Sequence, residues 1–203
     1  MTMKKSFGAK ILVYPTPVWV VGTYDKEGKP NMMTTSLGGI CSLTPPCVAV
    51  SLRENTHTYG NIVRHKAFTV NVPSEAHARE ADFIGIVSGR NVDKFAATGL
   101  TPVRSKFVDA PYVREFPLNV ECQLIQTVEI GQHTQFIGEI MDVMAEESVL
   151  SVDRDESMLG TEGIPDIEKV KPILYVPQMG TYYGIGRNLG QAHTIGKTIR
   201  GER

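Results

Sequence analysis

The chain has 203 residues, of which 41% are hydrophobic and 21% are charged, and its formal net charge is −1. This length allows one domain with a sizeable core, and the ordinary composition excludes wholesale disorder. Because neither acidic nor basic residues dominate, the composition gives no indication of a nucleic-acid or membrane surface, and any anion site must be local.

Neither a targeting segment nor a disulfide framework is indicated. The apolar run Ile11–Val13 is too short for a signal-peptide core, and no later run approaches the ~18 apolar residues of a membrane helix. The three cysteines, Cys41, Cys47 and Cys122, are odd in number and scattered, which favours buried free thiols. We therefore expect a cytoplasmic protein with a single domain over residues 1–203.

The first half of the chain is dense in β-strand signals. Val18–Tyr24 is rich in valine, and the polar cluster at 25–30 predicts a hairpin turn after it. Asn31–Cys41 then carries small polar residues and glycines, which are typical of a strand approached closely by a ligand or another backbone. Cys47–Arg53 and Phe68–Val72 alternate apolar and polar residues, which predicts two half-buried strands.

Short helices are predicted between and after these strands, at Thr58–Arg64, Ser74–Ile84 and Asn91–Thr98. We expect Thr56 or Thr58 to cap the first helix and Ser74 to cap the second, because short hydroxyl side chains satisfy free amides. Gly99 is expected to end the third helix, since glycine tolerates the left-handed conformation found there.

The second half is predicted to begin with two long strands, Val120–Ile130 and His133–Met144, joined by a turn. The remaining segments are expected to be a helix or loop at 146–155, weak structure at 158–170, a short strand at Ile173–Val176 and an irregular tail at 177–203. Many short strands with few, irregularly placed helices favour a mainly β barrel over a sandwich or a doubly wound sheet.

An anion site is one interpretation of the segment Ser51–Ile62. A strand ends at Arg53, and the hydroxyls of Thr56 and Thr58 follow where a helix begins. The free amides and dipole of that helix would face the same point as the guanidinium. The alternative is a capped helix beside a solvated arginine, and the segment alone leaves both open.

A slot for a flat ring is one interpretation of the segment Asn31–Gly39. Thr34, Thr35 and Ser36 can donate hydrogen bonds from hydroxyls and backbone amides, and the glycines would admit a close ligand. The alternative is an edge strand with a bulge.

Other residues carry weaker signals when read alone. Lys94 is expected to be a solvated lysine on a helix surface, and Trp19 a core residue. His133, at a strand start, can titrate near neutral pH. Gly184–Gly190 is a poor match to a dinucleotide loop because its third glycine is late and too little chain follows. No hydrolase motif and no pattern of metal ligands is evident.

Taken together, several short motifs resemble the flavin reductase-like, FMN-binding split-barrel family, and within it most closely the flavoredoxin subgroup. The match covers roughly residues 10–185, with its motifs in the same order and spacing. These motifs are Asn31-x-x-Thr34-x-Ser36, Pro45-Pro46, Val48-x-Val50-Ser51-Leu52-Arg53, Thr56-x-Thr58-x-x-Asn61-Ile62, Asp93-Lys94-Phe95 and His133-x-x-Phe136-Ile137-Gly138-Glu139-Ile140.

The resemblance implies a six-stranded Greek-key split barrel with short peripheral helices, FMN as cofactor, and a homodimer with the flavin at its interface. The isoalloxazine ring would meet Asn31, Thr34, Thr35 and Ser36. The ribityl chain and phosphate would be lined by Ser51, Leu52 and Arg53, with the phosphate also bound by Thr56 and Thr58. Lys94 would reach the flavin, either from the dimer partner or within its own chain, and His133 would lie near the ring or the phosphate, with the same two options.

Leu37 departs from the pattern of this family. Relatives of the flavoredoxin type can place a tryptophan at this position, where it would cover the flavin. A leucine makes that contact with the ring smaller.

The function expected from the resemblance is electron transfer through bound FMN. The chain would be a flavoredoxin-type electron carrier or an NAD(P)H:flavin reductase, with NAD(P)H or a ferredoxin-type protein as donor. No catalytic side chain is assigned, because the redox chemistry belongs to the flavin. The alternative is a non-catalytic module that holds flavin or haem on the same barrel.

Overall fold

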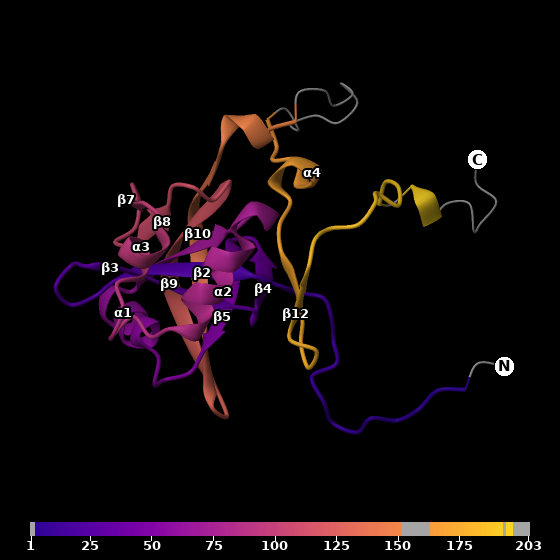
Figure 1. The fold of residues 1–203 in the computed structure, drawn as a ribbon, viewed down its shortest axis with the longest axis horizontal. Coiled ribbons are helices and arrows are strands. Elements are labelled where there is room, and N and C mark those ends of the chain that lie inside the picture. Colours follow the sequence, from indigo (N-terminus) through magenta and orange to yellow (C-terminus); the bar gives the residue numbers. More distant parts are fainter. Residues whose placement is uncertain (1–2, 152–162, 193, 197–203) are drawn as a thin grey trace.

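The computed structural model describes residues 3–151, 163–192 and 194–196. A sheet of seven antiparallel strands dominates it (Figure 1). In spatial order the strands are β3 (Pro30–Thr35), β2 (Trp19–Tyr24), β6 (Ala67–Val72), β9 (Leu118–Ile130), β10 (His133–Ala145), β5 (Pro46–Leu52) and β4 (Gly38–Leu43).

The sheet closes into a barrel through the link between its two outermost strands. β3 and β4 lie at opposite ends of the strand order, yet only Ser36 and Leu37 separate them in the chain. The Leu37 carbonyl accepts a hydrogen bond from the Ser51 amide at 2.8 Å, which ties this corner to β5. If β3 and β4 are taken as one bent strand, the barrel has the six strands that were predicted.

The single strand predicted at Asn31–Cys41 is therefore wrong in one respect. The structure breaks it at Ser36 and Leu37, because the chain must turn from one end of the sheet to the other to close the barrel. The strands predicted around it and in the second half of the chain are found within one or two residues of their expected ends.

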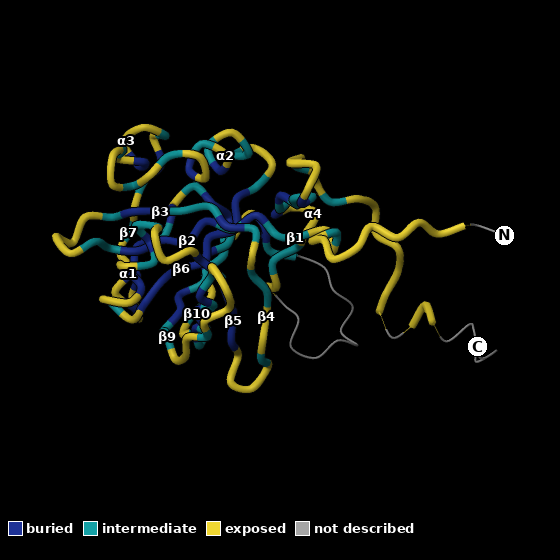
Figure 2. Tube along the Cα trace, turned by 90° about the horizontal axis from the view of Figure 1, so that it is seen from below, coloured by how far each residue is buried: buried dark blue, intermediate teal, exposed yellow. Residues whose placement is uncertain are grey.

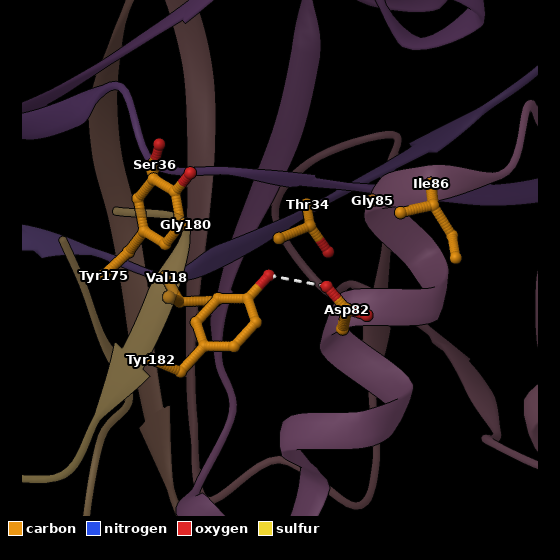
Figure 3. Close-up of a pocket in the computed structure, with 9 residues that line it drawn as sticks. All are labelled: Val18, Thr34, Ser36, Asp82, Gly85, Ile86, Tyr175, Gly180 and Tyr182. Atoms are coloured by element: carbon orange, nitrogen blue, oxygen red, sulfur yellow. Dashed lines mark hydrogen bonds between the residues drawn. The ribbon is translucent and has the colours of Figure 1, made fainter. Parts of the chain in front are cut away.

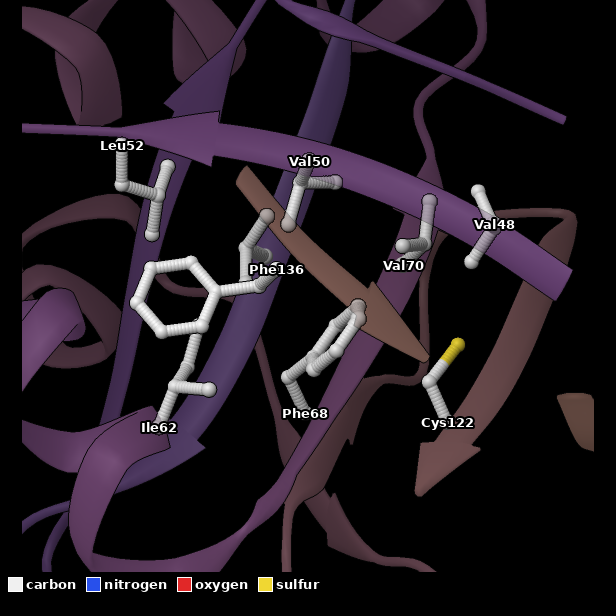
Figure 4. Packing of buried hydrophobic residues seen from close by; sticks show 9 residues of the cluster. Val48, Val50, Leu52, Ile62, Phe68, Val70, Cys122 and Phe136 are labelled. Atoms are coloured by element: carbon white, nitrogen blue, oxygen red, sulfur yellow. The ribbon is translucent and has the colours of Figure 1, made fainter. Parts of the chain in front are cut away.

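Side chains from alternate positions of the strands fill the barrel (Figure 4). Val48, Val50 and Leu52 of β5 are buried in this core, as the alternation of the sequence predicted. Phe68 of β6 and Phe136 of β10 are fully buried beside them. Burial of each such side chain stabilises the fold by roughly 1.5–3 kcal/mol.

Two glycines make room for aromatic rings of the barrel. A Cβ at Gly138 would lie 2.6 Å from the ring of Phe68, and a Cβ at Gly38 would lie 2.6 Å from the ring of Trp19. Trp19 packs against the core as expected. The space that a side chain at Gly38 would occupy is thus filled by Trp19, whereas nothing lies within 4 Å of the corresponding position at Gly39.

Two of the three cysteines are buried as predicted, namely Cys47 and Cys122. Cys41 is exposed, which contradicts the prediction, because it lies on the end strand β4 at an irregularity in the pairing with β5. All three thiols are free.

Short helices lie outside the barrel. They are α1 (His57–His65), α2 (Ala78–Ile86), α3 (Lys94–Thr98) and α4 (Ile167–Val170), with single 3₁₀ turns at Glu75–His77 and Glu147–Val149. The first predicted helix is correct to within one residue. The second begins with the 3₁₀ turn after Ser74, whose side chain makes no capping bond, and the third begins at Lys94 and ends at Gly99 with φ +73°.

Short strands complete the fold in two smaller sheets. One contains β1 (Thr16–Pro17), β11 (Leu174–Val176) and β12 (Thr181–Tyr183), and the other contains β7 (Pro102–Arg104) and β8 (Pro111–Val113). The irregular tail predicted from residue 177 is therefore wrong at β12, which pairs with β11. Parts of the predicted segments 146–155, 158–170 and 177–203 lie outside the described residues.

Segments at both ends of the described chain leave the barrel on the same side (Figures 1 and 2). The arm 3–14 is exposed along almost its whole length, as is the segment 186–192. None of the helices in the described residues has the length and apolarity needed to cross a membrane.

Candidate functional site

Two adjoining hollows lie where α2 packs against β3. Gly85 and Ile86 of α2 line both of them. The first, called the lysine hollow, has a volume of about 250 Å³ and is bounded by 55–58 at the start of α1, by 85–89 and by Lys94. The second, called the tyrosine hollow, has a volume of about 320 Å³ and is bounded by β3, α2 and the β11–β12 hairpin.

The start of α1 brings free amides and hydroxyls to the lysine hollow. Thr56 is the N-cap: its hydroxyl oxygen accepts a hydrogen bond from the Tyr59 amide at 3.3 Å and its hydroxyl donates to the Arg53 carbonyl at 2.9 Å. The first turn contains no acidic residue. The positive end of the helix dipole is therefore not neutralised from within the helix, which suits an anion.

Lys94 supplies a cation to the same hollow. Its side chain is 4% exposed and its Nζ donates to the Ile84 carbonyl at 2.7 Å. The expectation of a solvated surface lysine is wrong, because Lys94 opens the short helix α3 on the side that packs toward β3. Burial lowers the pKa of Lys94 to about 8.

The turn after α2 was not identified from the sequence. Arg90 donates from Nη1 to the Asn55 carbonyl at 2.7 Å, which fixes the turn against the start of α1. Burial, and then the positive charge of Arg90, lower the pKa of His57. The signal that could have found this turn is the run Val87-Ser88-Gly89-Arg90, where small residues and an arginine follow a helix.

Buried hydrogen bonds join β3 to α1 beneath the lysine hollow. The Asn31 carboxamide donates to the Thr58 hydroxyl oxygen at 3.0 Å and to that of Thr23 at 3.4 Å. Asn61 also donates to Thr23, at 3.1 Å. Asn31 is thus turned toward other protein groups, and of the predicted site residues it is Thr56, Thr58 and Lys94 that line this hollow.

The tyrosine hollow contains two further predicted residues, Thr34 and Ser36 of β3 (Figure 3). The Thr34 hydroxyl donates to the Ala81 carbonyl of α2 at 2.5 Å. From the opposite side Tyr182 donates to the Asp82 carboxylate at 2.9 Å. Burial, and then this carboxylate, raise the pKa of Tyr182 to about 12, so its hydroxyl keeps its proton at neutral pH.

Aromatic rings wall one side of the tyrosine hollow. Tyr175 and Tyr182 lie on the paired strands β11 and β12, with ring centroids 5.5 Å apart. Asp82 is the one charged residue among those that line the hollow, and four of the others carry a hydroxyl group, namely Thr34, Ser36, Tyr175 and Tyr182. Such a lining suits a flat, uncharged ring with polar edges.

The remaining predicted residues lie outside both hollows. The Thr35 hydroxyl oxygen accepts from the Leu37 amide at 3.2 Å, and Leu37 is 43% exposed at the corner between β3 and β4. The Leu52 side chain is buried in the barrel core, so only its backbone can face a ligand.

The other three predicted residues lie near the end of β5. Ser51 is half-buried, Arg53 is exposed immediately after the strand, and His133 begins the neighbouring strand β10. The pairing of Leu52 with Thr134 places His133 beside this strand end.

Comparison with known proteins gives the same family as the resemblance seen in the sequence motifs. The family model for the flavin reductase like domain matches residues 11–160. Flavoredoxin of Desulfovibrio vulgaris (Miyazaki F) is 50% identical, with a TM-score of 0.88 over 96% of this chain and 100% of that one. Flavoredoxin from Methanosarcina acetivorans is 29% identical, with a TM-score of 0.84 over 98% and 99% of the two chains.

An uncharacterised protein of Archaeoglobus fulgidus is also similar, with 34% identity over 115 residues. That match spans 57% of this chain and 65% of the relative, just under two thirds of its length. The prediction of a split barrel of the flavoredoxin and flavin reductase type is confirmed by the family model and by both flavoredoxin structures. The chain belongs to the flavin reductase-like family.

Proposed function

We propose that the chain binds FMN along the two adjoining hollows and transfers electrons through it. The observation that supports this most directly is the buried Lys94 in a hollow that Thr58 and the start of α1 also line. This donor set fits a terminal phosphate, which carries up to two negative charges. Each phosphoryl group in the pyrophosphate of FAD carries a single negative charge, so the site favours FMN.

The position of the phosphate then sets the direction of the rest of the molecule. With the phosphate in the lysine hollow, the ribityl chain would pass Gly85 and the ring would reach Thr34 and Ser36. Their hydroxyls and amides, with those of Thr35, would donate to the polar edge of the ring. Leu37 would cover less of the ring than a tryptophan would.

The end of β5 would complete the cofactor contacts. We assign contacts with the ribityl chain and the phosphate to Ser51, to Arg53 and to the backbone of Leu52. His133 lies beside the same strand end and would be near the ring or the phosphate. When bound, FMN supplies one- and two-electron redox chemistry. The protein would hold the phosphate and orient the ring, and Asp82 and the tyrosines would limit what approaches it.

We further propose a homodimer with the flavin at the interface. Both hollows are open to solvent in a single chain, whereas flavin-sized ligands have most of their surface buried in their sites. A second copy that covers the hollows would provide this burial and exclude water from the ring. Electrons would come from NAD(P)H or a ferredoxin-type protein, donors that place the activity in the cytoplasm.

The test is a flavin titration followed by anaerobic reduction. We expect yellow protein with about one FMN per chain. Its absorbance at about 450 nm, near the flavin absorption maximum, should be lost when NADH, NADPH or reduced ferredoxin is added. Colourless protein that does not respond to added FMN would contradict the proposal. Bound FMN that none of the donors reduces would instead support the alternative of a flavin-holding module, and haem uptake would support a haem module.

A further inference from the structure

The hydrogen bond between Asn31 and Thr58 has a fixed direction with a consequence for the lysine hollow. A carboxamide nitrogen can only donate, whereas a hydroxyl can both donate and accept. Asn31 Nδ2 donates to Thr58 Oγ1 at 3.0 Å, so the hydroxyl proton of Thr58 is left to point elsewhere. Thr58 is 1% exposed, and it lines the lysine hollow.

The two ends of the Asn31 carboxamide face different neighbours. Nδ2 faces two hydroxyl oxygens, those of Thr58 and Thr23. The opposite side, Oδ1, lies against Gly89: a Cβ on that glycine would be 2.0 Å from Oδ1. Thr58 lines the lysine hollow, whereas Asn31 lies behind it and is not among the residues that line the hollow.

We propose that Asn31 is a positioning residue that turns the Thr58 hydroxyl toward the lysine hollow, where it donates to the phosphate of the flavin. This inference rests on the proposed function. It replaces the direct contact between Asn31 and the ring that the family resemblance implied. The amide of Asn31, the hydroxyl of Thr58 and the ligand would form a chain in which each group donates to the next.

A double-mutant cycle on FMN and riboflavin affinity tests this directly, since the two ligands differ only in the phosphate. Asn31→Ala is expected to weaken FMN binding about fivefold to tenfold in the wild-type background. In the Thr58→Val background the same change is expected to alter FMN affinity less than twofold. Riboflavin affinity should change less than twofold throughout, and Thr58→Ser should restore the effect of Asn31→Ala.

Asn61→Ala provides the matched control, because it removes the hydrogen bond to Thr23 but leaves the bond between Asn31 and Thr58. It should lower the melting temperature without changing the ratio of FMN to riboflavin affinity. If Asn31→Ala does not fold, Asn31→Asp takes its place in the cycle: its carboxylate can only accept, so it draws the Thr58 proton inward.

Two outcomes would overturn the inference while leaving the proposed function intact. One is an Asn31 effect of equal size with and without the Thr58 hydroxyl, and the other is an equal loss for FMN and riboflavin. Failure of the wild-type protein to bind FMN would instead remove the proposed function itself.

Discussion

Lys94 is a charged side chain that the fold has largely removed from water. Its only hydrogen bond partner among the described contacts is the carbonyl of Ile84, and burial is the sole cause of its lowered pKa. Such an ammonium is poorly solvated until an anion arrives. An incoming phosphate would therefore both gain from the charge and hold the proton on Lys94.

FMN affinity is expected to fall as pH rises above about 8. Lys94 in the unliganded protein loses its proton with a pKa of about 8, below the ordinary 10.5, so the charged fraction shrinks from neutral pH upward. Above that pKa, each pH unit should weaken FMN binding by up to about tenfold, because binding must first restore the proton. Fluorescence titrations with FMN over roughly pH 6.5 to 9.5 measure this.

Lys94→Met and riboflavin are the controls for this pH profile. The variant should bind FMN more weakly at neutral pH and show no further loss up to about pH 9.5, and riboflavin should be insensitive in both proteins. A wild-type affinity for FMN that is constant over this range would contradict the assignment of Lys94 to the phosphate.

At the scale of single residues, the sequence was sufficient to predict roles that depend only on residues nearby in the chain. Thr56 caps α1 as one of two expected candidates, because its partner Tyr59 is only three residues away. The burial of Lys94 and the inward donation of Asn31 to Thr58 were not predictable. Both depend on segments that meet only in the folded barrel, such as β3 and α1, whose residues Asn31 and Thr58 are 27 positions apart along the chain.

At the scale of elements, the junction of β5 and α1 joins the barrel to the lysine hollow. The strand ends at Leu52, and the Arg53 carbonyl accepts hydrogen bonds from both the amide and the hydroxyl of Thr56. The threonine thus fixes the turn and caps the helix. Its loss would free the first turn of α1 on the side that faces the hollow.

Thr56→Ala is expected to destabilise the protein by about 1 kcal/mol, the usual effect of removing a threonine N-cap. Urea unfolding followed by circular dichroism measures the change, and FMN affinity should fall with it because the amides of the first turn lose their order. Thr56→Ser keeps the capping oxygen and should restore both values. An unchanged urea midpoint in the alanine variant would show that Thr56 does not stabilise α1.

Element boundaries were predictable where the pattern is local. The alternation in β5 and β6 gave strands correct to within one residue, and the polar turn before β3 gave the start of that strand to within one residue. The break between β3 and β4 was missed, since it follows from closure of the whole barrel. β12 was missed as well, because its three residues are a strand only through pairing with β11.

At the scale of the molecule, the open hollows are one of two features that favour assembly. The other is the arm 3–14, which extends from the barrel with apolar side chains in water (Figure 2). Phe7, Ile11, Val13 and Tyr14 are all more than half exposed. Exposed large apolar side chains gathered in one segment favour an interaction site on this arm.

If the flavin lies at a dimer interface, then FMN binding and dimerisation must strengthen each other. With two equivalent sites per dimer, the dimer dissociation constant falls by the square of the factor by which each site gains FMN affinity. Sedimentation velocity over a dilution series is expected to show a dimer dissociation constant at least about tenfold lower with saturating FMN than without it. Reciprocally, FMN affinity should rise as the protein concentration passes through that constant, because the dimer buries more of the ring than the monomer can. A dissociation constant that is the same with and without FMN, or a dilute monomer that holds FMN at full affinity, would place the cofactor away from the interface and leave each chain with a complete site.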